Sequence, residues 1–370
     1  MRSQAMFFQE QAAQKACDPQ MQKTLAYVRP LFVGKRKKGL EGLAGDGLGF
    51  EEVRAVCQDI RDRVVGNLDV WLELFEERAQ ATGAEVLWAR DGDEVARLLV
   101  DLARQHGVRK VVKSKSMLSE EADLNAAFAA AGIESIETDL GEYIIQLAGE
   151  TPSHIIAPAV HKTKEEVADL FVKHHGLPRQ SDITALAREA RAVLRQHFLS
   201  ADMGVSGANF LLAETGSAVL VTNEGNGRMV TTLPRLHVVI AGIEKIIPNL
   251  QDLATLLRLL PRSATGQSIS NYVSVLTPRG GTTTTDASVE GPEKIVFVLV
   301  DNGRSSLLGG EFASMLRCIR CGACMNHCPV YTAIGGHAYG WVYPGPMGSV
   351  LTPLYTSLKT SHDLPQATTG

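Results

Sequence analysis

The stretch EVLWARDGDEVARLLVDLARQHGVRKVVK, from Glu85 to Lys113, decides the fold. It begins with a short apolar run, Glu85–Ala89, that predicts a β-strand, and it continues with Asp91–His106, whose apolar residues recur at helical spacing. Val108–Lys113 then predicts a second strand. Because strand, helix and strand in this order build parallel sheets, the stretch predicts an α/β layer.

The same alternation continues downstream. Helices are predicted over Ser119–Ala131, Lys164–His175 and Asp182–Leu199, and strands over Ile133–Thr138 and Ser153–Val160. The next segment is rich in apolar runs and turn-forming residues. Its predicted elements are a short helix at Leu253–Leu260 and strands at Ala208–Ala213, Ala218–Thr222, Arg235–Gly242, Tyr272–Leu276 and Lys294–Val300.

The two ends of the chain differ from this α/β part. Glu51–Thr82 carries apolar residues at helical spacing, whereas Gly34–Gly49 is glycine-rich with a basic run and predicts a solvated loop. Glu311–Cys318 predicts a helix, and Arg279–Thr285 predicts a loop. The expected organisation is a helical region at 1–82, an α/β domain at 83–305, a cysteine-bearing segment at 306–345 and an irregular tail at 346–370.

Length and charge limit the class of protein. A chain of 370 residues and 39.9 kDa is too long for one ordinary core. Lys and Arg number 37 and Asp and Glu number 41, a net charge of −4 that argues against nucleic-acid or anionic-membrane binding. The sequence contains no apolar run near the roughly 18 residues of a membrane span, and the N-terminus lacks a secretory apolar core. We therefore expect a cytoplasmic protein without a transmembrane segment.

Four of the six cysteines fall in one short window: Cys318, Cys321, Cys324 and Cys328. Their spacing, C-x2-C-x2-C-x3-C followed by proline, is that of bacterial ferredoxins and predicts a 4Fe–4S cluster rather than zinc, whose motifs come as separated cysteine pairs. The clustering also indicates a reducing compartment.

The cysteine count limits how many clusters this chain holds. Two such clusters would need twice the four cysteines of the motif, and the chain has six in all. We therefore expect one cluster at most, held by Cys318, Cys321 and Cys324. In two-cluster ferredoxins the fourth cysteine, here Cys328, ligates the other cluster. The fourth corner is then unassigned. Cys328 could fill it only if its direction differs from the usual pattern; His327 is a possible nitrogen ligand, although an exposed loop histidine is the simpler interpretation.

Several stretches resemble the lactate-utilization iron–sulfur protein B family over nearly the whole chain. They include KVVKSKSMLSEE (Lys110–Glu121), ETDLGEYIIQL (Glu137–Leu147), AETGSAVLVTNEGNGRM (Ala213–Met229) and CIRCGACMNHCPVY (Cys318–Tyr331). The resemblance implies a LUD domain, similar in fold to the sugar-phosphate isomerase and CoA-transferase group, followed by a ferredoxin-type module. It also implies a subunit of a system that oxidises L-lactate to pyruvate, with a second iron–sulfur protein and another LUD protein as partners. Family members carry two clusters and continue into a second cysteine motif, so the tail is expected to be truncated.

Two segments of the α/β domain are candidate anion sites. Lys113, Ser114, Lys115 and Ser116 follow a predicted strand, where open α/β sheets bind ligands, and could hold a carboxylate or phosphate. A surface loop with solvated lysines is the alternative. Arg228, in the run EGNGR, could add its guanidinium, or the run could be only a hairpin turn.

Glu214 is a weak catalytic candidate. It lies on a glycine-containing turn between two predicted strands and resembles the nucleophile position of CoA transferases; alternatively it accepts backbone N–H bonds in the turn. His154 and His161 have no third ligand at metal spacing, and no motif for NAD, FAD or ATP is present. The leading hypothesis is an electron-transfer subunit. The alternatives are a CoA-transferase- or isomerase-like enzyme with a structural or sensing cluster, and a non-catalytic scaffold.

Overall fold

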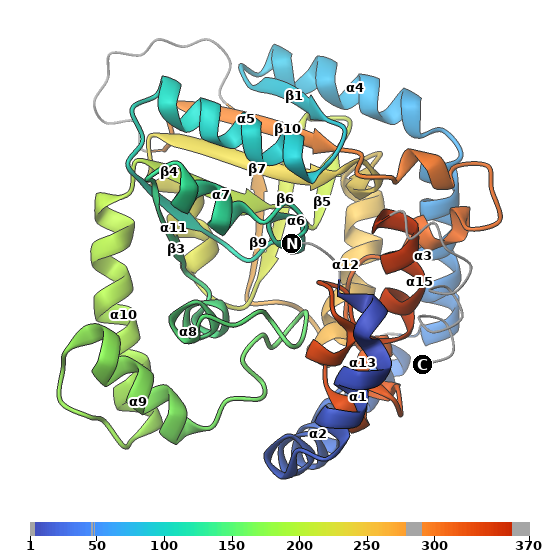
Figure 1. Cartoon of the computed structure of the whole chain (residues 1–370). Coiled ribbons are helices and arrows are strands. Elements are labelled where there is room, and N and C mark those ends of the chain that lie inside the picture. Colours follow the sequence, from blue (N-terminus) through green and yellow to red (C-terminus); the bar gives the residue numbers. More distant parts are fainter. Residues whose placement is uncertain (1–3, 46, 48, 279–290, 357–370) are drawn as a thin grey trace.

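The computed structural model describes residues 4–45, 47, 49–278 and 291–356 (Figure 1). The loop predicted at Arg279–Thr285 and the last part of the predicted tail lie outside these residues. Among the described helices, none combines the length and apolar character that crossing a bilayer requires.

The main sheet has six strands in the order β1-β10-β7-β4-β2-β3, and every pair in it is parallel. The strands are β1 (Glu85–Ala89), β2 (Lys110–Lys113), β3 (Glu134–Glu137), β4 (Met203–Gly207), β7 (Leu236–Gly242) and β10 (Lys294–Val300). The α/β fold class with a parallel sheet is thereby confirmed. The sequence missed β4, because its glycines and serine carry little strand propensity.

A second, four-stranded sheet lies against the first. Its order is β8 (Ile246–Ile247), β5 (Phe210–Leu212), β6 (Ser217–Thr222) and β9 (Tyr272–Leu276). Leu211 and Ala218 of this sheet pack with Val239 and Phe297 of the main sheet. The β5–β6 hairpin is thus held next to the carboxyl ends of the main strands.

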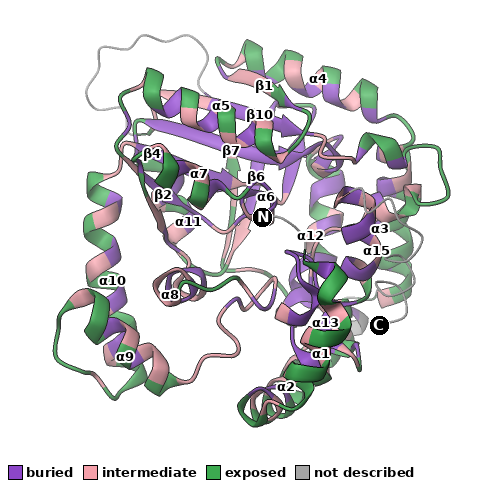
Figure 2. Cartoon of the chain, viewed as in Figure 1, coloured by how far each residue is buried: buried purple, intermediate pink, exposed green. Residues whose placement is uncertain are grey.

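Helices cover both sheets (Figures 1 and 2). One face of the main sheet packs against α5 (Gly92–Gln105), α6 (Met117–Glu121) and α7 (Leu124–Ala130). The inner strands β2, β4, β7 and β10 are largely buried, whereas the outward side of α5 is exposed (Figure 2). The other helices of the α/β part are α3 (Phe50–Val65), α4 (Leu68–Ala81), α8 (Leu140–Ala148), α9 (Lys164–His175), α10 (Ile183–Ser200), α11 (Asn226–Thr232) and α12 (Leu250–Ala264).

Two local predictions in this part are wrong. The helix expected at Ser119–Ala131 begins earlier and is divided, because Ser116 caps α6 and Asp123 adopts a left-handed conformation with φ 51° before α7. The strand expected at Ser153–Val160 is a series of turns. There the side chain of His154 accepts the backbone N–H groups that a strand would use for its ladder.

The glycine-rich stretch at 34–49 is not a loop up to residue 45, since α2 runs from Pro19 to Gly45. Leu43 is fully buried and packs with Leu256 of α12. A Cβ on Gly39 would lie 2.7 Å from the carbonyl oxygen of Gly266, so glycine lets the helix approach the chain beyond α12. Tertiary packing therefore overrides the low helix propensity of the glycines.

The C-terminal segment forms a small module with its own apolar core. It contains α13 (Ala323–His327), α14 (Tyr331–Ile334) and α15 (Gly345–Thr356). The tail predicted to be irregular from residue 346 is therefore helical up to Thr356, because Leu351 and Tyr355 bury against Trp341. The helix predicted at Glu311–Cys318 is only a 3₁₀ turn, Ala313–Arg317.

The N-terminal helices pack on this module rather than standing apart. Residues of α1 (Phe8–Ala16) and α2 form one apolar cluster with α13 and α14, in which Met21 and Leu25 contact the region of Tyr331 and Tyr339. α1 packs against α14 and the 3₁₀ turn His337–Tyr339, and α2 packs against α13 and α14. The two ends of the chain thus meet at the cysteine segment.

We expect Gly216→Ala to lower the melting temperature. Gly216 has φ +61°, and a Cβ there would overlap the backbone nitrogen of Ala79 in α4. The substitution should cost about 1–3 kcal/mol of backbone strain plus the steric overlap. Gly107→Ala is the matched control, since Gly107 has the same φ with open space around it. Equal melting temperatures for the two variants would contradict the packing of this turn against α4.

Candidate iron–sulfur site and adjoining cavity

The cysteine loop is curled by two residues in left-handed conformations. Arg320 has φ 59° and Gly322 has φ 74°, which turns the chain sharply between Cys318, Cys321 and α13. The backbone N–H of Arg320 points at Cys318 Sγ, at 3.4 Å. The curled loop keeps Cys318, Cys321 and Cys324 close enough to influence one another electrostatically.

Cys318, Cys321 and Cys324 influence one another electrostatically. The pKa of Cys321 is raised to about 11, mainly by burial and in part by the neighbouring thiolates of Cys318 and Cys324. Burial and Cys318 also raise the pKa of Cys324. Backbone N–H groups at Ala323 oppose this effect. The cysteine loop thus carries three potential thiolate ligands within electrostatic range of one another, and this donor set fits a 4Fe–4S cluster.

Cys328 has different surroundings. It is buried in the apolar cluster shared with α2, accepts the N–H of Tyr331 at 3.4 Å and lies 4.0 Å from the hydroxyl of Tyr339. His327 is exposed, and burial together with Arg36 and Arg29 lowers its pKa. Nothing in its surroundings makes it more than an exposed loop histidine.

Three cations surround Cys318, and the sequence singled out none of them. The thiolate of Cys318 raises the pKa values of Arg61, Lys245 and Arg320 against burial, which lowers each of them. Arg61 is held in place by the carbonyl oxygens of Ile246 and Leu316, both at 2.9 Å. These positive groups compensate the negative charge that thiolate ligands bring.

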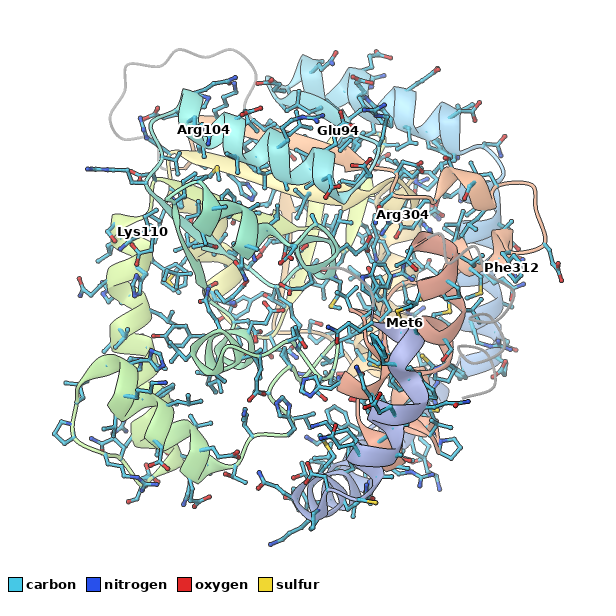
Figure 3. The ribbon with its side chains drawn as sticks, viewed as in Figure 1. Met6, Glu94, Arg104, Lys110, Arg304 and Phe312 are labelled. Carbon is cyan, nitrogen blue, oxygen red and sulfur yellow. The ribbon has the colours of Figure 1, made fainter. Side chains whose placement is uncertain are left out.

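A buried ionic network connects the cysteine loop to the main sheet. Arg304, which follows β10, binds Glu121 at 2.8 Å and Glu244 at 2.6 Å, and its guanidinium stacks on Tyr355 at 4.7 Å. Arg320 lies 3.6 Å from the second oxygen of Glu244. Figure 3 labels Arg304 where the sheet meets α15. The network therefore ties the module to the carboxyl edge of the sheet.

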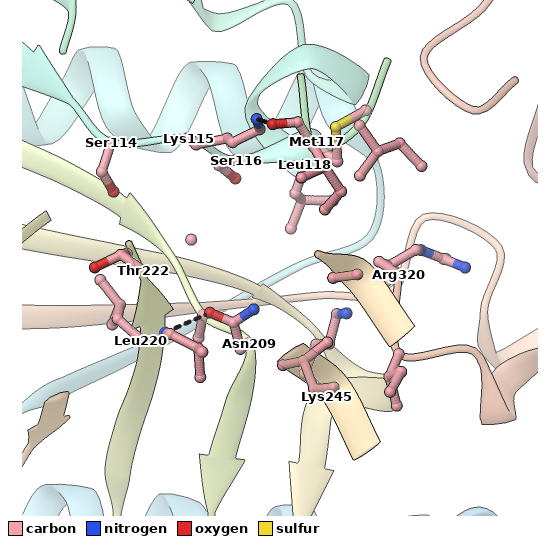
Figure 4. Close-up of a pocket in the computed structure, with 18 of the residues that line it drawn as sticks. Ser114, Lys115, Ser116, Met117, Leu118, Asn209, Leu220, Thr222, Lys245 and Arg320 are labelled. Atoms are coloured by element: carbon pink, nitrogen blue, oxygen red, sulfur yellow. Dashed lines mark hydrogen bonds between the residues drawn. The ribbon is translucent and has the colours of Figure 1, made fainter. Parts of the chain in front are cut away.

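A cavity of about 290 Å³ lies between that edge and the cysteine loop (Figure 4). The ends of β2, β4 and β7 form one wall, the β5–β6 hairpin forms another, and Ile319 and Arg320 close the side toward the cluster. Of the residues predicted to bind an anion, Ser114, Lys115 and Ser116 line this cavity. The ammonium of Lys115 donates to the carbonyl oxygen of Ile156 at 2.9 Å.

Two residues of the predicted anion site, Lys113 and Arg228, are engaged elsewhere in the structure. Lys113 is fully buried in an ion pair with Glu137 and also donates to Asn125 at 3.0 Å, so it is committed to the protein core. Arg228 stacks on Tyr272 at 4.4 Å and is not among the lining residues. Neither cation faces the cavity.

Glu214 is exposed and lies outside the cavity. Its carboxylate accepts the backbone N–H of Leu250 at 2.7 Å, at the first turn of α12. This is the role of a turn glutamate that satisfies a free helix N–H, and it gives no support to a nucleophile at this position.

His154 and His161, for which the sequence offered no metal-binding role, both have specific partners in the structure. His154 is buried, bonds Asn326 of α13 at 3.0 Å and has a pKa lowered by burial to about 4. His161 lies with Glu150 and His337 in a group whose nitrogen and oxygen atoms are within 4.8 Å of one another. The sequence could not find this group, because its members are far apart along the chain. Lys162 also binds Glu150, so the carboxylate already has a cationic partner.

Two family models match this chain. Residues 72–300 match the LUD domain model, and residues 314–363 match a 4Fe–4S dicluster domain. A solved structure of a DUF162 family protein from Deinococcus radiodurans is 13% identical and covers 63% of this chain and 98% of its own, with a TM-score of 0.35.

Relatives match over most of the chain. Lactate utilization protein B of Bacillus licheniformis is 45% identical over 86% of this chain and 66% of its own length. Lactate utilization protein B of Geobacillus kaustophilus is 43% identical over 92% of this chain and 72% of its own length. The Escherichia coli protein named uncharacterized electron transport protein YkgF is 43% identical over 97% of this chain and 74% of its own length. The chain thus spans about two thirds to three quarters of the length of these relatives. It belongs to the lactate utilization protein B family, in which a LUD domain is followed by a 4Fe–4S dicluster domain.

Proposed function

We propose that this chain is an electron-transfer subunit of a system that oxidises L-lactate to pyruvate. The observation that carries the proposal is that Cys318, Cys321 and Cys324 lie on one curled loop with the ferredoxin spacing, close enough to influence one another electrostatically. The names of the relatives, lactate utilization protein B and electron transport protein, support the same role. A 4Fe–4S cluster bound there supplies one-electron transfer.

The residues around the cysteine loop would contribute to electron transfer electrostatically. Each electron that enters adds negative charge beside Cys318, where Arg61, Lys245 and Arg320 lie. Fixed positive charges and N–H groups near the sulfurs favour the reduced state. Cys324 is exposed, so the edge of the site that it occupies is the natural point of electron exchange with a partner.

The partners that we propose are a second iron–sulfur protein and another LUD protein. In such an assembly the two-electron oxidation of lactate takes place elsewhere, and this chain passes electrons one at a time. The alternative, a CoA-transferase-like enzyme, loses its main support because Glu214 caps α12 outside the cavity.

The test is reduction of the reconstituted chain by lactate. We expect an electron paramagnetic resonance signal of a reduced cluster when L-lactate and both partner proteins are added anaerobically, and none when either the lactate or the partners are omitted. A cluster that stays oxidised in the complete mixture would point to the scaffold role. Lactate oxidation by this chain alone, with a dye as acceptor, would show an enzyme instead.

A further inference from the structure

The cavity beside the cysteine loop contains a lysine without a partner. Lys245 follows β7 in the 3₁₀ turn Ile243–Lys245, and its side chain rises into the cavity (Figure 4). Within the described part of the chain, its ammonium has no hydrogen bond or ion pair. Among the other cations that line the cavity, Lys115 is engaged by a carbonyl oxygen and Arg304 by two carboxylates. Arg320 pairs with Glu244 at 3.6 Å, although its Nε and Nη1 have no hydrogen-bond partner in the described ranges.

The surroundings of Lys245 make an unpartnered ammonium costly. The pKa of Lys245 is lowered to about 8, mainly by burial and also by Arg320 and Arg61, against the opposing effects of Glu244 and Cys318. Glu244 is paired with Arg304 at 2.6 Å and, among the described residues, makes no ion pair or hydrogen bond with Lys245, so it affects the lysine only at longer range. A desolvated cation beside other cations is stabilised when an anion enters the cavity.

Asn209 provides a second free donor next to Lys245. Its side-chain oxygen accepts the backbone N–H of Val221 at 2.8 Å, which fixes the orientation of the amide. The Nδ2 group then points away from β6, and across the residues that the structure describes it has no acceptor. Figure 4 shows Asn209 and Lys245 on the same side of the cavity, facing Ser114 and Ser116.

We propose that this cavity binds a small carboxylate anion, held by the Nζ of Lys245 and the Nδ2 of Asn209. These two donors match the two oxygens of a carboxylate, and the apolar side chains of Leu220 and Ile319 form walls for the rest of the molecule. A volume of about 290 Å³ corresponds to roughly ten water molecules, which suits a small acid.

The cavity adjoins the cysteine loop, so that a ligand bound in it lies against residues next to the proposed cluster ligands. Ile319 and Arg320, which line the cavity, are the two residues between Cys318 and Cys321. A carboxylate that binds at Lys245 therefore changes the charge and contacts of the cysteine loop itself. The choice of lactate and pyruvate as probes rests on the proposed function, whereas the anion site does not.

The test is isothermal titration of the reconstituted full chain with L-lactate, pyruvate and inorganic phosphate. We expect lactate or pyruvate to bind, and Lys245→Met to weaken that binding about tenfold or more, the value of a hydrogen bond to a charged group. Asn209→Asp should also abolish binding, because it keeps the acceptor for Val221 but places a negative charge in the cavity. Lys294→Met is the control, since Lys294 pairs with Glu85 at the opposite edge of the sheet.

Iron per chain is measured for every variant, so that lost binding is not confused with a lost cluster. Equal affinity in Lys245→Met and parent, binding of phosphate without either carboxylate, or no binding in the parent would each overturn the proposal. A chain that fails this test but is still reduced by lactate through its partners would leave the proposed function standing. Addition of the carboxylate should also shift the electron paramagnetic resonance spectrum of the parent but not that of Lys245→Met.

Discussion

Replacing Cys321 by serine is expected to abolish iron loading, whereas replacing Cys328 should remove little of it. Cys321 lies between Cys318 and Cys324 and interacts with both thiolates, so a serine there leaves two ligands. Cys328 is held in the apolar cluster with Tyr331 and Tyr339. The measurement is iron and sulfide per chain after anaerobic reconstitution, with about four irons expected in the parent and in Cys328→Ser.

Cys57→Ser is the matched control for the loss of a thiol. Cys57 is buried in α3 against α12 and belongs to no group of cysteines, so its replacement should leave iron loading unchanged. Equal loss of iron from Cys321→Ser and Cys328→Ser would show that all four motif cysteines serve one cluster. About twice the expected iron in the parent would contradict the proposal of a single cluster.

The elements that the sequence predicted most accurately are those with a strong apolar pattern between clear breaks. The predicted limits of β1, β9, β10 and α9 coincide with the observed ones. The failures occur where a distant contact decides the local structure. Gly39 is helical because α2 must pass close to Gly266, which no local pattern records.

The candidate site likewise contains some residues that the sequence could reveal and others that only the fold brings together. The cysteines were found because their ligand spacing is local, and Ser114 to Ser116 because they follow a strand in a sheet of predictable polarity. Lys245, Asn209 and Arg61 could not be found, since each is an ordinary residue until folding brings it to the cavity or to Cys318. Lys113 looked available in the sequence, but its partner Glu137 lies on a different strand.

The network around Arg304 has the largest expected effect on stability. Arg304 and its partners Glu121 and Glu244 are almost fully buried. Arg304→Met would remove the buried cation shared by Glu121 and Glu244 and leave Glu244 only the longer contact with Arg320, at a cost of about 3–5 kcal/mol in the free energy of unfolding. Urea unfolding of variant and parent at neutral pH measures this difference in the free energy of unfolding. Arg317→Met is the control: its pair with Asp62, at 2.9 Å, is partly exposed and should contribute at most about 1 kcal/mol.

The pH dependence of this loss distinguishes an electrostatic role of Arg304 from simple packing. Although burial alone would raise the pKa of Glu244, Arg304, Arg320 and Lys245 lower it to about 2. In the parent this pairing stabilises the fold above the unfolded carboxyl pKa of about 4.3, and the contribution is lost as the pH falls toward 2. In Arg304→Met the buried carboxylates take up protons more readily, so the difference in stability between variant and parent should shrink on acidification. A difference that stays constant from pH 7 to pH 4 would show that Arg304 acts only by filling space beside Tyr355.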